Sequence, residues 1–292
     1  MIINNKNIFI ASDGAEVSYY VNGRSDGGAA VVFVHGLLDS AEDWNGVIGA
    51  ASKSHMCVSF DLRGHGRSTA VDGFTVGRAA ADLRELISHL SLGSVSLVGF
   101  SLGAFVVLEY VRTYGCDSVS KIVLADITPK FINEDGWNLG LYQGEYTRSE
   151  FERNMRGKTA DFNREVGYFV YRNVLAAREG RRFRNTAPAW ARLLTFLVVG
   201  SSPARKTVVY EYFKSMCECD ERPALHMMTA DTAVFYAEPG SLFPPAAAKY
   251  MADRISGATA LVPFRDSAHI TVLRPASRFA RELLRFIGGG DA

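Results

Sequence analysis

Short runs of apolar residues alternate along the chain with longer segments in which apolar residues recur at helical spacing. The runs at 30–34, 56–60, 95–100 and 121–126 are rich in β-branched residues and almost uninterrupted. Such runs are typical of strands that are covered on both faces of a sheet. The segment 79–90 shows the helical spacing between two of these strands. This alternation predicts an α/β protein with a mostly parallel central sheet flanked by helices.

The two ends of the chain extend the same pattern. Alternating apolar residues on either side of Asp13-Gly14, a strong turn pair, predict a hairpin over 7–21. After residue 228 the alternation of strands and helices resumes, and a loop over 265–269 is expected before the last helix. The strands expected in this part are 232–237 and 258–262, and the helices are 244–255 and 275–287.

The segment 130–228 has a different pattern, because helical spacing dominates it and aromatic residues are dense. It predicts a helical cap inserted into a core formed by residues 1–129 and 229–292. A cap of this kind forms one wall of the cleft beneath it, so some of its aromatic side chains are expected to contact the substrate. Trp137 and Trp190 are the candidates that we select.

A Gly-x-Ser-x-Gly motif follows the strand at 95–100, and an apolar helical pattern follows the motif. A strand, a tight turn and a helix hold Ser101 at the apex of the turn, and Gly99 and Gly103 supply the small neighbours that such a turn needs. The backbone N–H of Leu102 then lies at a helix N-terminus, where it can stabilise an oxyanion. Ser101 is therefore a candidate nucleophile.

A serine hydroxyl is a weak nucleophile and needs a base within hydrogen-bond distance, for which histidine is suited because it titrates near neutral pH. His269 follows the last expected strand, at the edge of the sheet where sites of α/β proteins form. It is the candidate general base. His35, directly after the strand at 30–34, is expected to pack or hydrogen-bond near the site. Together with Phe100 it is a candidate contact to the substrate.

Three landmarks occur in order: His35-Gly36 after a strand, the motif around Ser101, and His269 before the final helix, with the glycine-rich turn 61–68 between the first two. In this combination the chain resembles the α/β-hydrolase superfamily with a helical cap. The resemblance covers nearly the whole chain outside the cap. It implies that Ser101 is the nucleophile, that His269 is the general base and that a carboxylate orients the histidine. It also implies that the backbone N–H groups of Leu37 and Leu102 hold the oxyanion.

The carboxylate departs from the usual pattern of that family. In most members an aspartate ends a Gly-x-x-Asp pattern after the strand corresponding to 232–237, and Gly240 occupies that position here. Asp126 is favoured, because it ends a central strand next to the nucleophile strand, as in certain haloalkane dehalogenases, lactonases and cofactor-independent quinolone dioxygenases. Glu238 is the alternative acid, whereas Asp266 is close to His269 in the same loop and poorly placed to orient it.

Composition narrows the classes of partner. The chain has 292 residues, 48% of them hydrophobic and 22% charged, with a formal net charge of +1. This balance gives no reason to expect a nucleic acid or an anionic membrane as a partner. Four cysteines in so long a chain do not indicate a disulfide framework, and no signal-peptide or transmembrane pattern is visible, so a cytoplasmic location is expected. No cofactor and no metal site are expected, and a homodimer is left open.

These observations favour a serine hydrolase that cleaves an ester, lactone or thioester bond of a small apolar or aromatic substrate. Its acyl-enzyme would form on Ser101, with His269 as general base and Asp126 as orienting acid. One alternative is a cofactor-independent ring-opening dioxygenase of an N-heteroaromatic substrate of the 3-hydroxy-4-quinolone type. In it the pair of His269 and Asp126 would act as base. A hydrolase-like small-molecule receptor is the other alternative.

Overall fold

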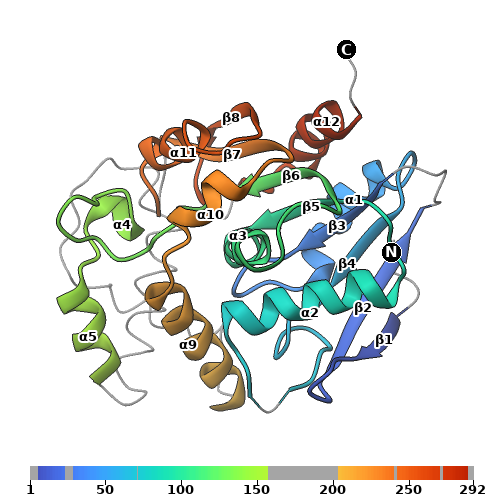
Figure 1. Cartoon of the computed structure of the whole chain (residues 1–292), viewed down its shortest axis with the longest axis horizontal. Coiled ribbons are helices and arrows are strands. Elements are labelled where there is room, and N and C mark those ends of the chain that lie inside the picture. Colours follow the sequence, from blue (N-terminus) through green and yellow to red (C-terminus); the bar gives the residue numbers. More distant parts are fainter. Residues whose placement is uncertain are drawn as a thin grey trace.

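The computed structural model describes residues 6–23, 29–70, 72–156, 203–239, 242–269 and 272–288. The strands in these ranges are β1 (Lys6–Ile10), β2 (Glu16–Asn22), β3 (Ala30–Val34), β4 (Cys57–Phe60), β5 (Val95–Phe100), β6 (Val119–Ala125), β7 (Asp231–Pro239) and β8 (Ala258–Ser267). They form an eight-stranded sheet in the order β1-β2-β4-β3-β5-β6-β7-β8 (Figure 1). The strand β2 is antiparallel to β1 and β4, and all other neighbours are parallel. The predicted α/β fold with a mostly parallel sheet is therefore confirmed.

Helices cover both faces of this sheet. On one face lie α2 (Val76–His89) and α3 (Leu102–Tyr114), whose buried residues share a hydrophobic cluster with β5. On the other face α1 (Asn45–Ala51) and α12 (Ala276–Ile287) form a second cluster with β3 and β7. The helix α3 is apolar around most of its circumference and buried from its first residue to Val111, which explains its place at the centre of the molecule.

The remaining described helices follow the core strands or belong to the predicted cap. They are the 3-10 helix η1 (Ala41–Trp44), α4 (Leu141–Gly144), α5 (Arg148–Arg156), α9 (Pro203–Glu218), α10 (Arg222–Met227) and α11 (Pro245–Ala252). Figure 1 shows α4, α5 and α9 together at the left of the sheet. The predicted cap boundaries at 130 and 228 stay a prediction, since 157–202 lies outside the described residues, as does Trp190. Among the described residues, no helix has the length and apolarity to cross a membrane.

The last two strands are longer than the sequence pattern predicts. The strand β7 continues to Pro239 and β8 to Ser267, and they pair to their ends, with Glu238 opposite Arg265. The expected loop at 265–269 was therefore wrong for its first three residues. Polar residues end the apolar run in the sequence, but β8 is the edge strand and β7 pairs only with β8 beyond Phe235, so both strands continue through polar residues. This extension carries the chain up to His269.

Candidate active site

Strand register brings Ser101 and Asp126 together. In the parallel pair of β5 and β6, Phe100 lies opposite Ala125, so the next residue of each strand leaves the sheet at the same point. Ser101 has a φ of 54° and Asp126 a φ of 47°, both in the left-handed region that is unfavourable for residues other than glycine. The Ser101 N–H donates to the Ala125 carbonyl at 3.0 Å, and the Asp126 N–H donates to Phe235 at 2.7 Å. Backbone hydrogen bonds thus hold both residues in strained conformations, a condition typical of functional sites.

Two glycines allow the close approach of α3 to the sheet at Ser101. A Cβ atom on Gly99 would lie 2.6 Å from the backbone nitrogen of Ala104, and one on Gly103 would overlap the carbonyl of Val34. No side chain larger than hydrogen fits these positions. The sequence motif therefore has the predicted conformation, with Ser101 between the end of β5 and the first turn of α3.

Ser101, His269 and Asp126 form a continuous hydrogen-bonded chain. The His269 Nε2 atom lies 2.9 Å from Ser101 Oγ, and its Nδ1 atom lies 2.6 Å from Asp126 Oδ2. The second oxygen of Asp126 accepts the N–H of Ala237 at 2.8 Å. A carboxylate accepts and does not donate, so Nδ1 carries the proton and Nε2 presents a lone pair to the serine hydroxyl. The exposed fractions of 7%, 4% and 5% show that water is largely excluded from all three.

Aromatic rings fix the orientation of the His269 imidazole. Phe100 stacks on it with a centroid distance of 4.9 Å and an interplanar angle of 28°, and Phe243 meets it edge-on at 5.7 Å. Phe100, which the sequence singles out as a substrate contact, is itself 4% exposed. Its contact in this structure is with the candidate base.

Two backbone N–H groups are available for an oxyanion. Leu102 begins α3, and the first N–H groups of a helix have no acceptor within it. Leu37 lies in the segment 35–40, which we call the oxyanion loop, and its N–H has no acceptor among the described residues. Leu37 and Leu102 follow the carboxyl ends of the neighbouring strands β3 and β5, and their role as oxyanion donors stays a prediction.

His35 is a buried part of the oxyanion loop. Its Nδ1–H donates to the Gly36 carbonyl at 2.7 Å, and its Nε2 accepts the N–H of Leu62 at 3.0 Å. Burial lowers the pKa of His35 to about 4, so the ring is neutral near pH 7. With both nitrogens occupied and 1% of the residue exposed, the structure does not bring His35 to a substrate. This matches the expectation that it hydrogen-bonds within the loop.

The other candidate residues have partners outside the hydrogen-bonded chain of Ser101, His269 and Asp126. The Glu238 side chain is 41% exposed and faces Arg265, with 3.6 Å between Oε2 and Nε. Trp137 donates its indole N–H to the Lys130 carbonyl at 3.1 Å, and its ring meets Tyr250 at 4.9 Å. Both ring nitrogens of His269 are already occupied by Ser101 and Asp126, so the structure places Asp126 rather than Glu238 where an orienting acid is needed.

Sequence reasoning missed a cavity of about 700 Å³ on the β4 side of the oxyanion loop. Its walls come from the oxyanion loop, from the turn after β4 and from α9, which belongs to the predicted cap. The half-buried Asp39 lies on this wall, and desolvation of its carboxyl raises the pKa to about 6. Asp39 and Ser40 precede η1, and residues of these types are common at the start of a helix. The sequence pattern therefore did not indicate that they line a cavity. Among the described residues, no group of three or more His, Cys, Asp or Glu side chains could hold a metal ion.

Comparisons with known proteins bear on the family and the fold. A family model described as alpha/beta hydrolase fold matches residues 29–274. The non-heme haloperoxidase of Rhodococcus erythropolis is 27% identical over 250 residues, which covers 80% of this chain and 82% of that protein. The bromoperoxidase from Bacillus anthracis superposes with a TM-score of 0.78 at 21% identity, and the esterase from Exiguobacterium antarcticum with 0.75 at 23%. Each superposition covers 97% of this chain and 100% of the compared chain. At these identities the similarity shows that this chain and the two compared proteins have the same fold.

Proposed function

The chain belongs to the α/β-hydrolase fold family and is an enzyme of the hydrolase type, and from this premise we propose that it is a serine hydrolase. Its proposed substrate is a small apolar or aromatic ester, lactone or thioester, which it cleaves through an acyl-enzyme on Ser101. The hydrogen-bonded chain from Ser101 through His269 to Asp126 is the observation that carries this proposal. That chain contains a nucleophile, a base and an orienting acid in the order that acyl transfer requires.

The first half of the proposed reaction forms the acyl-enzyme. The Nε2 atom of His269 removes the proton from Ser101 Oγ as Oγ attacks the acyl carbon. The carbonyl oxygen becomes an oxyanion, which the N–H groups of Leu37 and Leu102 stabilise. Asp126 stabilises the imidazolium that forms. The imidazolium then gives its proton to the leaving oxygen or sulfur as the bond to the acyl carbon breaks.

The second half returns the free enzyme. A water molecule gives a proton to His269 Nε2, and its oxygen attacks the acyl carbon in the same oxyanion hole. The bond between Ser101 Oγ and the acyl carbon breaks, and Oγ recovers its proton from the imidazolium. Phe100 and Phe243 line the imidazole with apolar surface. The esterase among the structural relatives supports an ester as the class of substrate.

Active-site labelling tests the proposal. We expect a fluorophosphonate to form an adduct that peptide mapping places on Ser101, and we expect the adduct to be absent from Ser101→Ala and His269→Ala. The unlabelled enzyme should hydrolyse p-nitrophenyl butyrate, and Ser101→Ala should not. Oxygen uptake with carbon monoxide release from a 3-hydroxy-4-quinolone, retained in Ser101→Ala, would instead support the ring-opening dioxygenase. Tight ligand binding without turnover would support the receptor.

A further inference from the structure

A second buried histidine lies behind the oxyanion loop. His65 belongs to the turn after β4 and is 8% exposed. Its Nε2 atom lies 2.5 Å from the Leu37 carbonyl oxygen, and its Nδ1 atom lies 3.2 Å from the Arg63 carbonyl oxygen. Burial lowers the pKa of His65 to about 4, so near pH 7 the ring carries one proton. Since a carbonyl only accepts, the shorter contact identifies Nε2 as the protonated nitrogen and the Leu37 carbonyl as its acceptor.

This hydrogen bond complements the one that His35 makes. The peptide group between Gly36 and Leu37 is planar and trans, so its N–H points away from its carbonyl. His35 binds that carbonyl at 2.7 Å, which leaves the Leu37 N–H on the opposite side. His65 binds the carbonyl of the following peptide group. The two histidines therefore hold the peptide groups on both sides of the Leu37 Cα atom, and both backbone dihedral angles of Leu37 are constrained.

The His65 ring is held from two sides by other rings. Its centroid lies 5.1 Å from that of His35 and 5.4 Å from that of Tyr212 in the cap helix α9. The Tyr212 hydroxyl donates to the carbonyl of Arg63, two residues before His65, at 3.4 Å. Ring packing of this kind restricts rotation of the imidazole. The oxyanion loop is thus connected through His65 to a helix of the cap.

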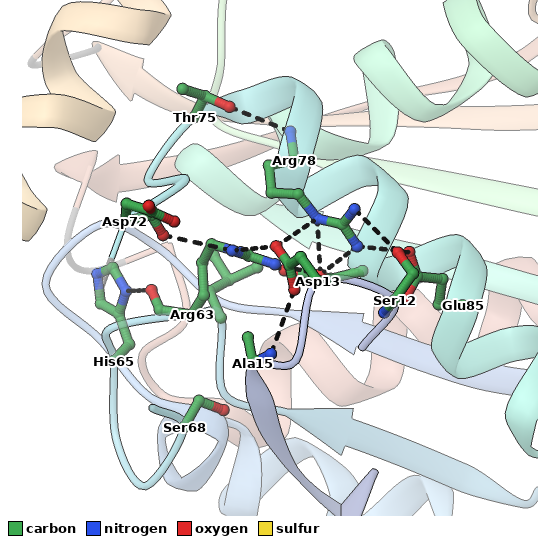
Figure 2. A network of polar contacts seen from close by, with 12 residues as sticks. Ser12, Asp13, Ala15, Arg63, His65, Ser68, Asp72, Thr75, Arg78 and Glu85 are labelled. Atoms are coloured by element: carbon green, nitrogen blue, oxygen red, sulfur yellow. Dashed lines mark hydrogen bonds and ion pairs between the residues drawn. The ribbon is translucent and has the colours of Figure 1, made fainter. Parts of the chain in front are cut away.

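An ionic network fixes the turn that carries His65 (Figure 2). The guanidinium of Arg63 makes two hydrogen bonds of 2.7 Å to the carboxylate of Asp82 in α2, and its Nη1 atom lies 2.9 Å from Asp13. Arg78 binds the same Asp82 carboxylate at 2.8 Å. The side chains of Arg63 and Asp82 are 1% and 0% exposed. Buried two-point contacts of this kind are rigid, so the turn is joined to the β1–β2 hairpin and to α2.

We propose that His65 is a positioning residue, whose Nε2–H holds the Leu37 carbonyl so that the Leu37 N–H stays directed at the developing oxyanion. The inference rests on the proposed function, because it concerns the oxyanion hole of the same site. His65 does not touch the reacting atoms in this account. It acts through the backbone of the oxyanion loop, from the side opposite to Ser101 and His269.

Two variants of His65 test this role. His65→Ala removes the donor, and we expect kcat for p-nitrophenyl butyrate to fall about 10- to 100-fold, less than the loss on deleting an oxyanion donor itself, while KM changes less than about twofold. His65→Gln places an amide N–H at a similar reach and should recover kcat to within about threefold of the wild-type value. His226→Ala, at an exposed histidine of α10, is the matched control and should leave both constants unchanged. A folded His65→Ala with wild-type kcat, or a folded His65→Gln as slow as His65→Ala, would overturn the inference.

Nitrogen NMR of the wild-type imidazole rings tests the hydrogen bond without any substrate. We expect the His65 signals to show a neutral ring with the proton on Nε2 at neutral pH, and a proton on Nδ1 would overturn the inference. This readout also separates two kinds of failure. If the wild-type enzyme neither hydrolyses the ester nor reacts with the fluorophosphonate, the proposed function is what fails. If it does both, and His65→Ala is equally active, only the role of His65 is lost.

Discussion

The two sides of the oxyanion loop each hold buried histidines, but with different partners. On the side of β5 and β6, His269 lies between a serine hydroxyl and the carboxylate of Asp126. On the β4 side, His35 and His65 face only backbone groups. All three residues are no more than 8% exposed, so burial does not distinguish them.

The partner decides what a buried imidazole can do. A carboxylate stabilises the imidazolium and lets the ring accept a proton during a reaction. Carbonyl oxygens carry no full charge and do not offset the cost of burying a charged imidazolium. Burial therefore lowers the pKa of His35 and of His65 to about 4. We infer that the first arrangement suits a base and the second suits a fixed donor. The predictions below test this contrast, beginning with the largest expected effect.

Replacing the histidine that faces a carboxylate should have the largest effect. His269→Ala leaves Ser101 without a base, and we expect kcat for p-nitrophenyl butyrate to fall by about 10⁴- to 10⁶-fold. His226→Ala serves as the control with no expected loss. If His269→Ala lost less than about tenfold, the contrast between the two sides of the loop would be refuted, since a general base contributes at least about 100-fold.

The next largest effect should come from removing the negative charge beside His269. Asp126→Asn keeps the size of the side chain but permits the wrong tautomer of the imidazole, and kcat should fall by about 10³- to 10⁴-fold. Glu238→Gln is the matched control, because this half-exposed carboxylate faces Arg265. Steady-state kinetics with both variants decides between the two acids. A large loss in Glu238→Gln and a small one in Asp126→Asn would reverse the assignment.

The β4 side should respond in stability. Asp82→Asn leaves the buried guanidinium of Arg63 without its main counter-charge, and the free energy of unfolding should decrease by about 3–5 kcal/mol in urea titrations. Asp13→Asn removes a contact of the same guanidinium from a side chain that is 37% exposed, and should cost at most about 1 kcal/mol. Equal effects of the two variants would contradict the view that Arg63 is held chiefly from its buried side.

A pH dependence of stability should also distinguish the β4 side. The unfolded chain binds a proton at His65 below about pH 6.5, whereas the folded chain binds it only near pH 4. As the pH falls from about 6.5 to about 4, the free energy of unfolding of the wild type should therefore decrease by about 1.4 kcal/mol per pH unit relative to that of His65→Gln. Above about pH 6.5 the difference between the two proteins should be constant. Urea midpoints of both proteins across this range provide the measurement. A difference that does not change with pH would show that the folded state protonates His65 freely.

Local patterns in the sequence were enough to predict the fold class, the family and the helix and strand around Ser101. Hydrophobic periodicity reports which faces of a segment are buried, and Gly99 and Gly103 belong to a motif of five residues that can be recognised locally, although Gly103 makes its close approach to Val34 of another strand. Both signals act over short distances along the chain. The ends of β7 and β8 are not predicted, because the apolar runs stop at polar residues through which the two strands still pair with each other.

Tertiary structure decided which carboxylate faces His269 and what lies behind the oxyanion loop. The sequence left Asp126 and Glu238 as alternatives, because their distances from His269 depend on the register of β5, β6 and β7. No local pattern assigns His65 a role, since its hydrogen bond joins two loops and its partner Leu37 lies 28 residues away. Such pairings arise from packing between distant segments, and no local pattern of apolar and polar residues encodes them.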